Sequence, residues 1–174
     1  MFTLRVRRDS LADLPRIETA RLAIVALRPE DAEDLRRLTD DPAIIQAVDF
    51  LPNPFTLQDA RDLIRGGAQG RDRFLGAWTR DAGRTLVAVV GTHLRGPGTI
   101  EIGYWVGGAA RGRGFAFEAV SGIVGLLARR FPRRSVVAEC RPGNVASWSL
   151  LDKLGFRDTG EHGHRPGRRL LRLG

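Results

Sequence analysis

The stretch that decides the fold runs from residue 99 to residue 130 and reads TIEIGYWVGGAARGRGFAFEAVSGIVGLLARR. Its first part, residues 100–106, is rich in β-branched and aromatic residues and predicts a strand. After Phe115 the apolar residues recur at helical spacing. This predicts a long helix that ends before Pro132, because the residue before a proline avoids the helical region. The stretch is therefore expected to fold as a strand, a glycine-rich turn and a helix.

The turn has the properties of an anion site. Gly112 and Gly114 lack a Cβ atom, so successive backbone N–H groups can approach a ligand closely. The N-terminus of the following helix adds unpaired N–H donors and the positive end of the helix dipole. Together these features predict a site for a phosphate group. A glycine-rich turn without a ligand is the alternative at this point.

Two common phosphate-binding motifs fit this turn poorly. The dinucleotide fingerprint Gly-x-Gly-x-x-Gly needs a third glycine at the position of Phe117. The Walker loop needs Gly-Lys-Ser/Thr, whereas the single lysine of the chain, Lys153, lies far from the turn. Both motifs are disfavoured.

The turn resembles the coenzyme-A signature of the GNAT N-acetyltransferase superfamily, Gln/Arg-x-x-Gly-x-Gly/Ala. Arg111, Gly114 and Ala116 stand at its fixed positions, after a strand reading Ile-Gly-Tyr-Trp and before a long helix. Residues 18–32 resemble the opening of the Rim-type branch, which acetylates ribosomal-protein N-termini, and residues 144–156 resemble its second cofactor segment. The three segments follow one another in the family's order, so the resemblance covers nearly the whole chain.

The resemblance implies acetyl-CoA as the cofactor and assigns its contacts. The backbone of the turn would hold the pyrophosphate, and a backbone N–H at the strand end, from Val106 or its neighbour, would meet the acetyl carbonyl. Asn144 would contact the pantetheine arm, in addition to capping its helix. The arginine side chains of the turn would bind phosphate or only surround the site as surface charge. The residues expected at the cofactor are Trp105, Val106, Arg111, Gly112, Arg113, Gly114, Phe115, Ala116 and Asn144.

The resemblance implies that an amine attacks the thioester of acetyl-CoA directly. That amine must lose a proton, which calls for a base. Glu101, on the cofactor strand, is the expected base, and His93 on the preceding strand is the second candidate. Glu101 has an alternative interpretation as an exposed carboxylate or an arginine partner, and His93 as a structural histidine. Ser147 is expected to face the leaving thiol, with small polar packing as its alternative. Many superfamily members carry a tyrosine acid at the position of Leu151, and this chain lacks it.

The other elements follow from periodicity, turn residues and helix caps. Strands are expected at residues 17–27, 74–79, 85–94, 135–139, 156–161 and 168–173, helices at 29–40, 56–65 and 144–155, and a short helical turn at 43–51. Three consecutive strands would form an antiparallel meander, and the long helix would join it to a parallel strand. This predicts an α/β fold with one mixed sheet and helices on both faces, and the resemblance implies that the fold is of the GNAT type.

The chain has 174 residues and is expected to be a single domain, 1–174, with residues 1–16 as a loose N-terminal extension. Its net charge is +8, carried almost entirely by arginine. A single cysteine, Cys140, leaves no internal disulfide and fits a cytoplasmic location. No membrane span, secretory signal or metal-ligand spacing is recognised in the sequence.

Two functions are compatible with these features. The first is acetyl transfer from acetyl-CoA to a primary amine by direct attack in a ternary complex. Its acceptor would be a small molecule or a protein N-terminus, including that of a ribosomal protein, and the family makes a homodimer the expected assembly. The second is a non-catalytic module that binds coenzyme A or RNA on the same fold, with the basic surface as its RNA contact.

Overall fold

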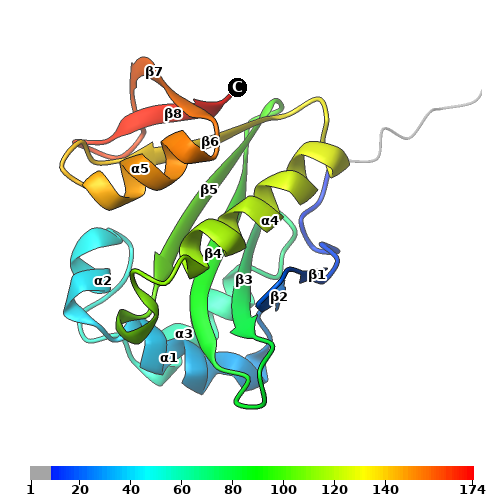
Figure 1. The fold of residues 1–174 in the computed structure, drawn as a ribbon, viewed down its shortest axis with the longest axis vertical. Coiled ribbons are helices and arrows are strands. Elements are labelled where there is room, and N and C mark those ends of the chain that lie inside the picture. Colours follow the sequence, from blue (N-terminus) through cyan, green and yellow to red (C-terminus); the bar gives the residue numbers. More distant parts are fainter. Residues whose placement is uncertain (1–8) are drawn as a thin grey trace, which may run out of the picture.

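The computed structural model describes residues 9–174, which form one mixed sheet with helices on both faces (Figure 1). In chain order the strands are β1 (Ile17–Glu18), β2 (Leu22–Ala26), β3 (Asp72–Thr79), β4 (Leu86–Arg95), β5 (Thr99–Val106), β6 (Ser135–Cys140), β7 (Phe156–His162) and β8 (Arg169–Leu173). The helices are η1 (Pro29–Asp31), α1 (Ala32–Thr39), α2 (Pro42–Ala47), α3 (Leu57–Gly66), η2 (Gly108–Ala110), α4 (Phe115–Arg130) and α5 (Val145–Lys153).

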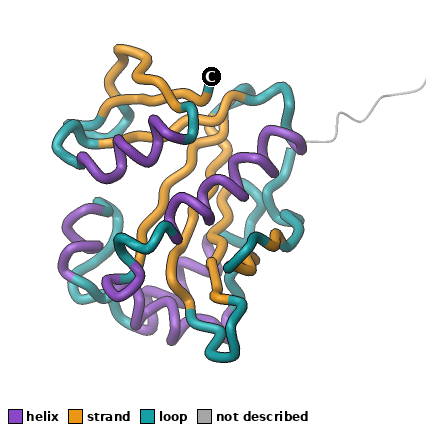
Figure 2. Tube along the Cα trace, in the orientation of Figure 1, coloured by secondary structure: helices purple, strands orange, loops and turns teal. Residues whose placement is uncertain are grey.

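The sheet has the order β1-β2-β3-β4-β5-β6-β8-β7. Strands β1 to β5 are antiparallel neighbours, β5 and β6 are parallel, and β8 lies between β6 and β7. The predicted mixed sheet, with its meander and parallel strand–helix–strand unit, is therefore confirmed. Figure 2 shows the long α4 crossing the strands of the meander.

The parallel pair is short, and this positions the site. Strands β5 and β6 pair only from Thr99↔Ser135 to Ile102↔Ala138. From Gly103 onward β5 continues beside β4, while β6 turns away toward β8. The sheet is thus open between β5 and β6 beyond Ile102.

Each face of the sheet carries its own apolar core. Helix α4 covers one face with Ala119, Ile123 and Leu127, which are fully buried at the spacing that one helical stripe requires. Burial of one such leucine or isoleucine contributes about 1.5–3 kcal/mol. Helices α1 and α3 cover the opposite face around Phe55 and Trp78. The sheet that carries the opening is therefore packed against an apolar core on each face.

Two local expectations are corrected. The strand expected at 17–27 is divided, because Thr19 and Leu22 close a turn in which Leu22 N–H donates to Thr19 Oγ1 at 3.0 Å. The chain before it is not loose over its described part, since Leu11 is 0% exposed and Leu14 is also buried. Residues 1–8 of the expected extension lie outside the described residues. Within the described chain, no helix has the length and hydropathy needed to cross a membrane.

Candidate active site

A cavity of about 1230 Å³ opens where β5 and β6 diverge, and it is lined from both faces of the sheet. On the α4 face its walls include Ser121, Asn144 and Ser147, and on the opposite face Phe74 and His93. Of the residues expected at the site, all line this cavity except Glu101 and Arg113. The end of β5 can therefore be reached through this cavity from either face of the sheet.

The glycine-rich turn forms the cradle that its sequence predicts. Gly112 and Gly114 have φ angles of +71° and +78°, the left-handed region that favours glycine. Glu118 N–H donates to the Gly114 carbonyl at 3.1 Å and so begins the hydrogen bonding of α4. The N–H groups of residues 112–117 have no acceptor within the described part of the chain. Successive free N–H groups of this kind bind anions.

An ion pair that sequence reasoning missed anchors this turn. Arg21 donates from Nη1 to the Arg113 carbonyl at 2.9 Å and from Nε to Glu118 at 2.7 Å. Glu118 also accepts from Thr19 Oγ1 at 2.6 Å. Burial opposes the charge on Glu118, but the hydrogen bonds from Thr19 and Arg21 prevail and lower the pKa of this carboxyl. The cation of Arg21 lies 4.4 Å from the centre of the Phe115 ring, so it fixes the start of α4 from outside.

Arg21→Ala tests this anchor. We expect the KM for acetyl-CoA to rise about tenfold, because the turn loses a charge-assisted hydrogen bond of roughly 1.5–3 kcal/mol that is partly screened by solvent. The value of kcat should change less than about threefold, because the lost contact affects binding of the cofactor equally in the ground state and the transition state. Arg16→Ala is the matched control, since Arg16 forms an exposed pair with Glu18. Equal KM values for Arg21→Ala and wild type would show that the turn holds its shape unaided.

The two arginines of the turn have different surroundings. Arg111 lines the cavity and donates from Nη2 to Asp41 at 2.8 Å. The Arg113 cation lies 5.1 Å from the centre of the Phe115 ring, and Arg113 is not part of the cavity wall. The surface-charge interpretation therefore fits the Arg113 side chain, and its contribution to the cradle is its backbone.

The start of α5 places Asn144 and Ser147 at the cavity. Ser147 N–H donates to Asn144 Oδ1 at 3.1 Å, which confirms Asn144 as the helix cap. The Ser147 hydroxyl lies 2.6 Å from the hydroxyl of Tyr104, the single tyrosine of the chain. Burial raises the pKa of Tyr104 to about 12, so its hydroxyl stays protonated. Leu151, at the position of the tyrosine that the chain lacks, is buried in the core.

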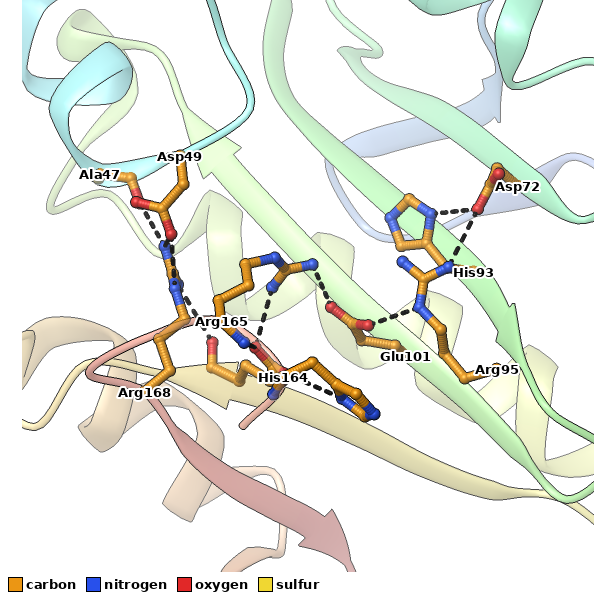
Figure 3. Close-up of polar contacts among 10 residues, drawn as sticks. Ala47, Asp49, Asp72, His93, Arg95, Glu101, His164, Arg165 and Arg168 are labelled. Carbon is orange, nitrogen blue, oxygen red and sulfur yellow. Dashed lines mark hydrogen bonds and ion pairs between the residues drawn. The ribbon is translucent and has the colours of Figure 1, made fainter. Parts of the chain in front are cut away.

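On the opposite face Glu101 is held by two arginines (Figure 3). Glu101 is 3% exposed and accepts from Arg95 Nε at 2.8 Å and from Arg165 Nη2. Burial alone would raise the pKa of Glu101, but the two guanidinium groups lower it overall. The two arginines fit the alternative interpretation of Glu101 as an arginine partner. A carboxylate whose pKa is lowered in this way is a weaker proton acceptor. The assignment of Glu101 as the base stays a prediction.

The loop between β7 and β8 borders this side of the cavity, and sequence reasoning missed its contacts. Glu139, with a fully buried side chain, accepts from His164 N–H at 2.6 Å and from Arg165 N–H at 3.2 Å. Arg168 donates to Asp49 at 2.8 Å and to the Ala47 carbonyl at 2.9 Å. The loop thereby joins β6 to the chain after α2. The sequence separation of these partners leaves no local signal that could have revealed them.

Three aromatic side chains form a cluster in the wall of the cavity. Phe50, Phe74 and Trp105 pack with ring centres 6.1–6.3 Å apart. The Trp105 indole donates to Thr39 Oγ1 at 3.0 Å on the face away from α4. The Trp105 side chain therefore lies on the face away from α4, and its expected contact with the cofactor stays a prediction.

Comparison with known proteins decides the family. The family model described as an acetyltransferase (GNAT) domain matches residues 21–157. The chain belongs to the GNAT acetyltransferase family. The predicted membership is thus confirmed.

Individual relatives agree with the family. The uncharacterized N-acetyltransferase YnaD of Bacillus subtilis is 24% identical over 145 residues, which cover 83% of this chain and 84% of YnaD. A putative ribosomal-protein-serine acetyltransferase from Vibrio cholerae has a TM-score of 0.78 at 22% identity, covering 93% of this chain and 98% of that one. RimL, a ribosomal L7/L12 α-N-protein acetyltransferase in complex with coenzyme A, has a TM-score of 0.78 at 18% identity, covering 91% and 97%.

The family and its curated relatives identify the chain as an N-acetyltransferase. This favours the enzyme over the non-catalytic module that the sequence left open. The solved structures show that the fold is shared with Rim-type enzymes.

Proposed function

We propose that this GNAT enzyme transfers the acetyl group of acetyl-CoA to a primary amine, which attacks directly while both substrates are bound. The acceptor is the N-terminus of a protein or peptide, including a ribosomal protein, or a small-molecule amine. One observation carries the proposal: a single cavity runs from the cradle of free N–H groups before α4, past the end of β5, to the opposite face of the sheet.

The residues on the α4 face fit acetyl-CoA. The free N–H groups of residues 112–117 suit a diphosphate, and the cavity continues from them toward Asn144. When bound there, acetyl-CoA supplies the thioester that carries the acetyl group. The backbone N–H of Val106 would meet the carbonyl oxygen, an interaction worth about 3 kcal/mol in other acyl-transfer enzymes. The N–H of the next residue, Gly107, already donates to the Val87 carbonyl at 3.0 Å.

In this proposal Ser147 passes a proton to the departing sulfur. Its hydroxyl faces the cavity at the start of α5, and Tyr104 holds that hydroxyl from β5. Because the Tyr104 hydroxyl stays protonated, it can donate to Ser147 while Ser147 donates into the cavity. This arrangement supplies a donor where the chain has Leu151 in place of a tyrosine.

Thiol release from acetyl-CoA, measured with a panel of peptide N-termini and small amines, tests the proposal. We expect release with at least one acceptor and a rise in melting temperature with coenzyme A alone, since a ligand that binds the folded state stabilises it. Absence of both would contradict the proposal. Binding of RNA with a steep salt dependence, without thiol release, would favour the non-catalytic module.

Glu101→Gln tests the role of the paired carboxylate. We expect it to lower the melting temperature by about 2–4 °C, because Arg95 and Arg165 lose a charged partner worth about 1 kcal/mol after solvent screening. The same variant should lower kcat less than about tenfold and leave the stabilisation by coenzyme A intact. A hundredfold loss of kcat at an unchanged melting temperature would instead establish Glu101 as the base.

A further inference from the structure

His93 and Asp72 form a pair whose role the functional proposal does not explain. His93 on β4 is 8% exposed, and its Nδ1 lies 2.7 Å from Oδ1 of Asp72 on β3. A carboxylate can only accept, so Nδ1 carries the hydrogen and the neutral ring presents the lone pair of Nε2. Nε2 has no hydrogen-bond partner among the residues that the structure describes. Figure 3 shows the ring turned so that one nitrogen meets Asp72.

Two glycines show where Nε2 points. A Cβ atom added to Gly91 would lie 2.8 Å from His93 Nε2, so this nitrogen occupies the space above the Gly91 backbone where a side chain would otherwise lie. Gly91 is the cross-strand partner of Gly103, and side chains of directly paired residues share one face. A Cβ atom added to Gly103 would meet nothing within 4 Å, which means that open cavity lies above it. Gly103 is also the first residue of β5 beyond its pairing with β6.

The charges around His93 favour a neutral ring. Burial lowers the pKa of His93 below its ordinary value, and the nearby Arg95 acts in the same direction. Asp72 and the more distant Glu101 oppose this shift but do not reverse it. Arg165, on the β7–β8 loop, forms an ion pair with Glu101 and so adds a further positive charge to this group of residues. Asp62 on α3 and Arg165 also line a smaller cavity of about 350 Å³ that adjoins His93.

We propose that His93 is the general base of the acetyl transfer and that Asp72 is its positioning residue. This inference rests on the proposed function. The amine of the acceptor enters from the face opposite α4 and lies over Gly103. Nε2 takes one proton from the amine as the new C–N bond forms. The C–S bond breaks and the sulfur takes a proton through the Ser147 hydroxyl, which regains one from water as Nε2 returns its proton to water. Asp72 holds the ring in the tautomer that leaves Nε2 free to accept.

Three variants test the pair: His93→Gln, Asp72→Asn and, as a matched control, His162→Gln. His162 is an exposed histidine of β7 outside the cavity wall. We expect His93→Gln to lower kcat about 10²-fold, a typical contribution of a general base, with the KM for acetyl-CoA within about twofold. The fall of kcat toward acid pH, at saturating acceptor, should be present in wild type and His162→Gln and absent in His93→Gln.

Asp72→Asn keeps the imidazole and supplies a readout besides activity. The titration of the His93 ring, followed by NMR and assigned by its absence in His93→Gln, should move to lower pH, because the hydrogen bond and charge of Asp72 raise this pKa. The acid fall of kcat should move with it, and kcat should drop about tenfold. A His93 titration that does not respond, or a shift without any change in kcat, would overturn the positioning role.

The outcomes separate the inference from the function beneath it. Wild-type turnover with an equal kcat and pH profile in His93→Gln would overturn His93 as the base and leave the acetyltransferase standing. A wild type that releases no thiol with any amine would overturn both. Loss of kcat in Glu101→Gln as large as in His93→Gln, with the acid limb lost in both, would assign the proton to the carboxylate instead.

Discussion

Gly114→Ala is expected to abolish the stabilisation of the protein by coenzyme A and to raise the KM for acetyl-CoA about 10²-fold or more, a loss of about 3 kcal/mol. The reason lies in the backbone. Gly114 has a φ of +78°, a conformation that costs an alanine about 1–2 kcal/mol. A Cβ atom there would also lie 3.3 Å from Nη2 of Arg21, the residue that anchors the turn.

Relief of this strain would rotate the peptide units that present the N–H groups of residues 112–117. The matched control is Gly98→Ala, because a Cβ atom at Gly98 meets nothing within 4 Å and its φ lies outside the left-handed region. Differential scanning fluorimetry with and without coenzyme A measures the stabilisation. A Gly114→Ala protein that coenzyme A stabilises as strongly as wild type would place the diphosphate elsewhere.

Glu139→Ala is expected to destabilise the protein by about 3 kcal/mol, because loss of one partner from a buried hydrogen-bonded group leaves the others unsatisfied. The fully buried carboxylate accepts from the backbone N–H groups of His164 and Arg165 and from the Arg165 side chain at 3.3 Å. A Cβ atom on Gly163 would lie 2.7 Å from Cδ of Glu139, so the loop wraps closely around this group.

The loop that Glu139 holds also borders the acceptor side of the cavity through Arg165 and Arg168. Glu139→Ala should therefore raise the KM for the acceptor amine more than the KM for acetyl-CoA. Urea unfolding measures the stability, with the exposed Glu161→Ala on β7 as the control. A loss of stability below about 1 kcal/mol would show that the loop does not depend on this carboxylate.

The donor half of the site could be predicted from the sequence because its signals are local. The glycines of the turn, the start of α4 at Phe115 and the cap at Asn144 each depend on a few consecutive residues. The divided first strand was missed because one side chain, Thr19, closes a turn within an apolar run. The expected helix boundaries agree with the structure within a few residues, because helix caps and prolines act at short range along the chain.

The acceptor half could not be predicted because its contacts join distant parts of the chain. Glu101 meets Arg165 across 64 residues, and Arg168 meets Asp49 across 119. Alternation could place Glu101 on a sheet face, but it could not show which cations would cover that face. The hollow beside His93 depends on the register that sets Gly91 opposite Gly103, which neither strand encodes alone.

The central claim is that the free N–H groups before α4 hold the diphosphate of acetyl-CoA at the opening between β5 and β6. A crystal structure of the chain grown with coenzyme A tests it most directly. We expect diphosphate oxygens about 2.7–3.2 Å from the N–H groups of residues 112–117, with the thiol arm passing Asn144 toward Ser147. Coenzyme A bound elsewhere, or these N–H groups bonded to the protein's own carbonyls, would contradict the claim.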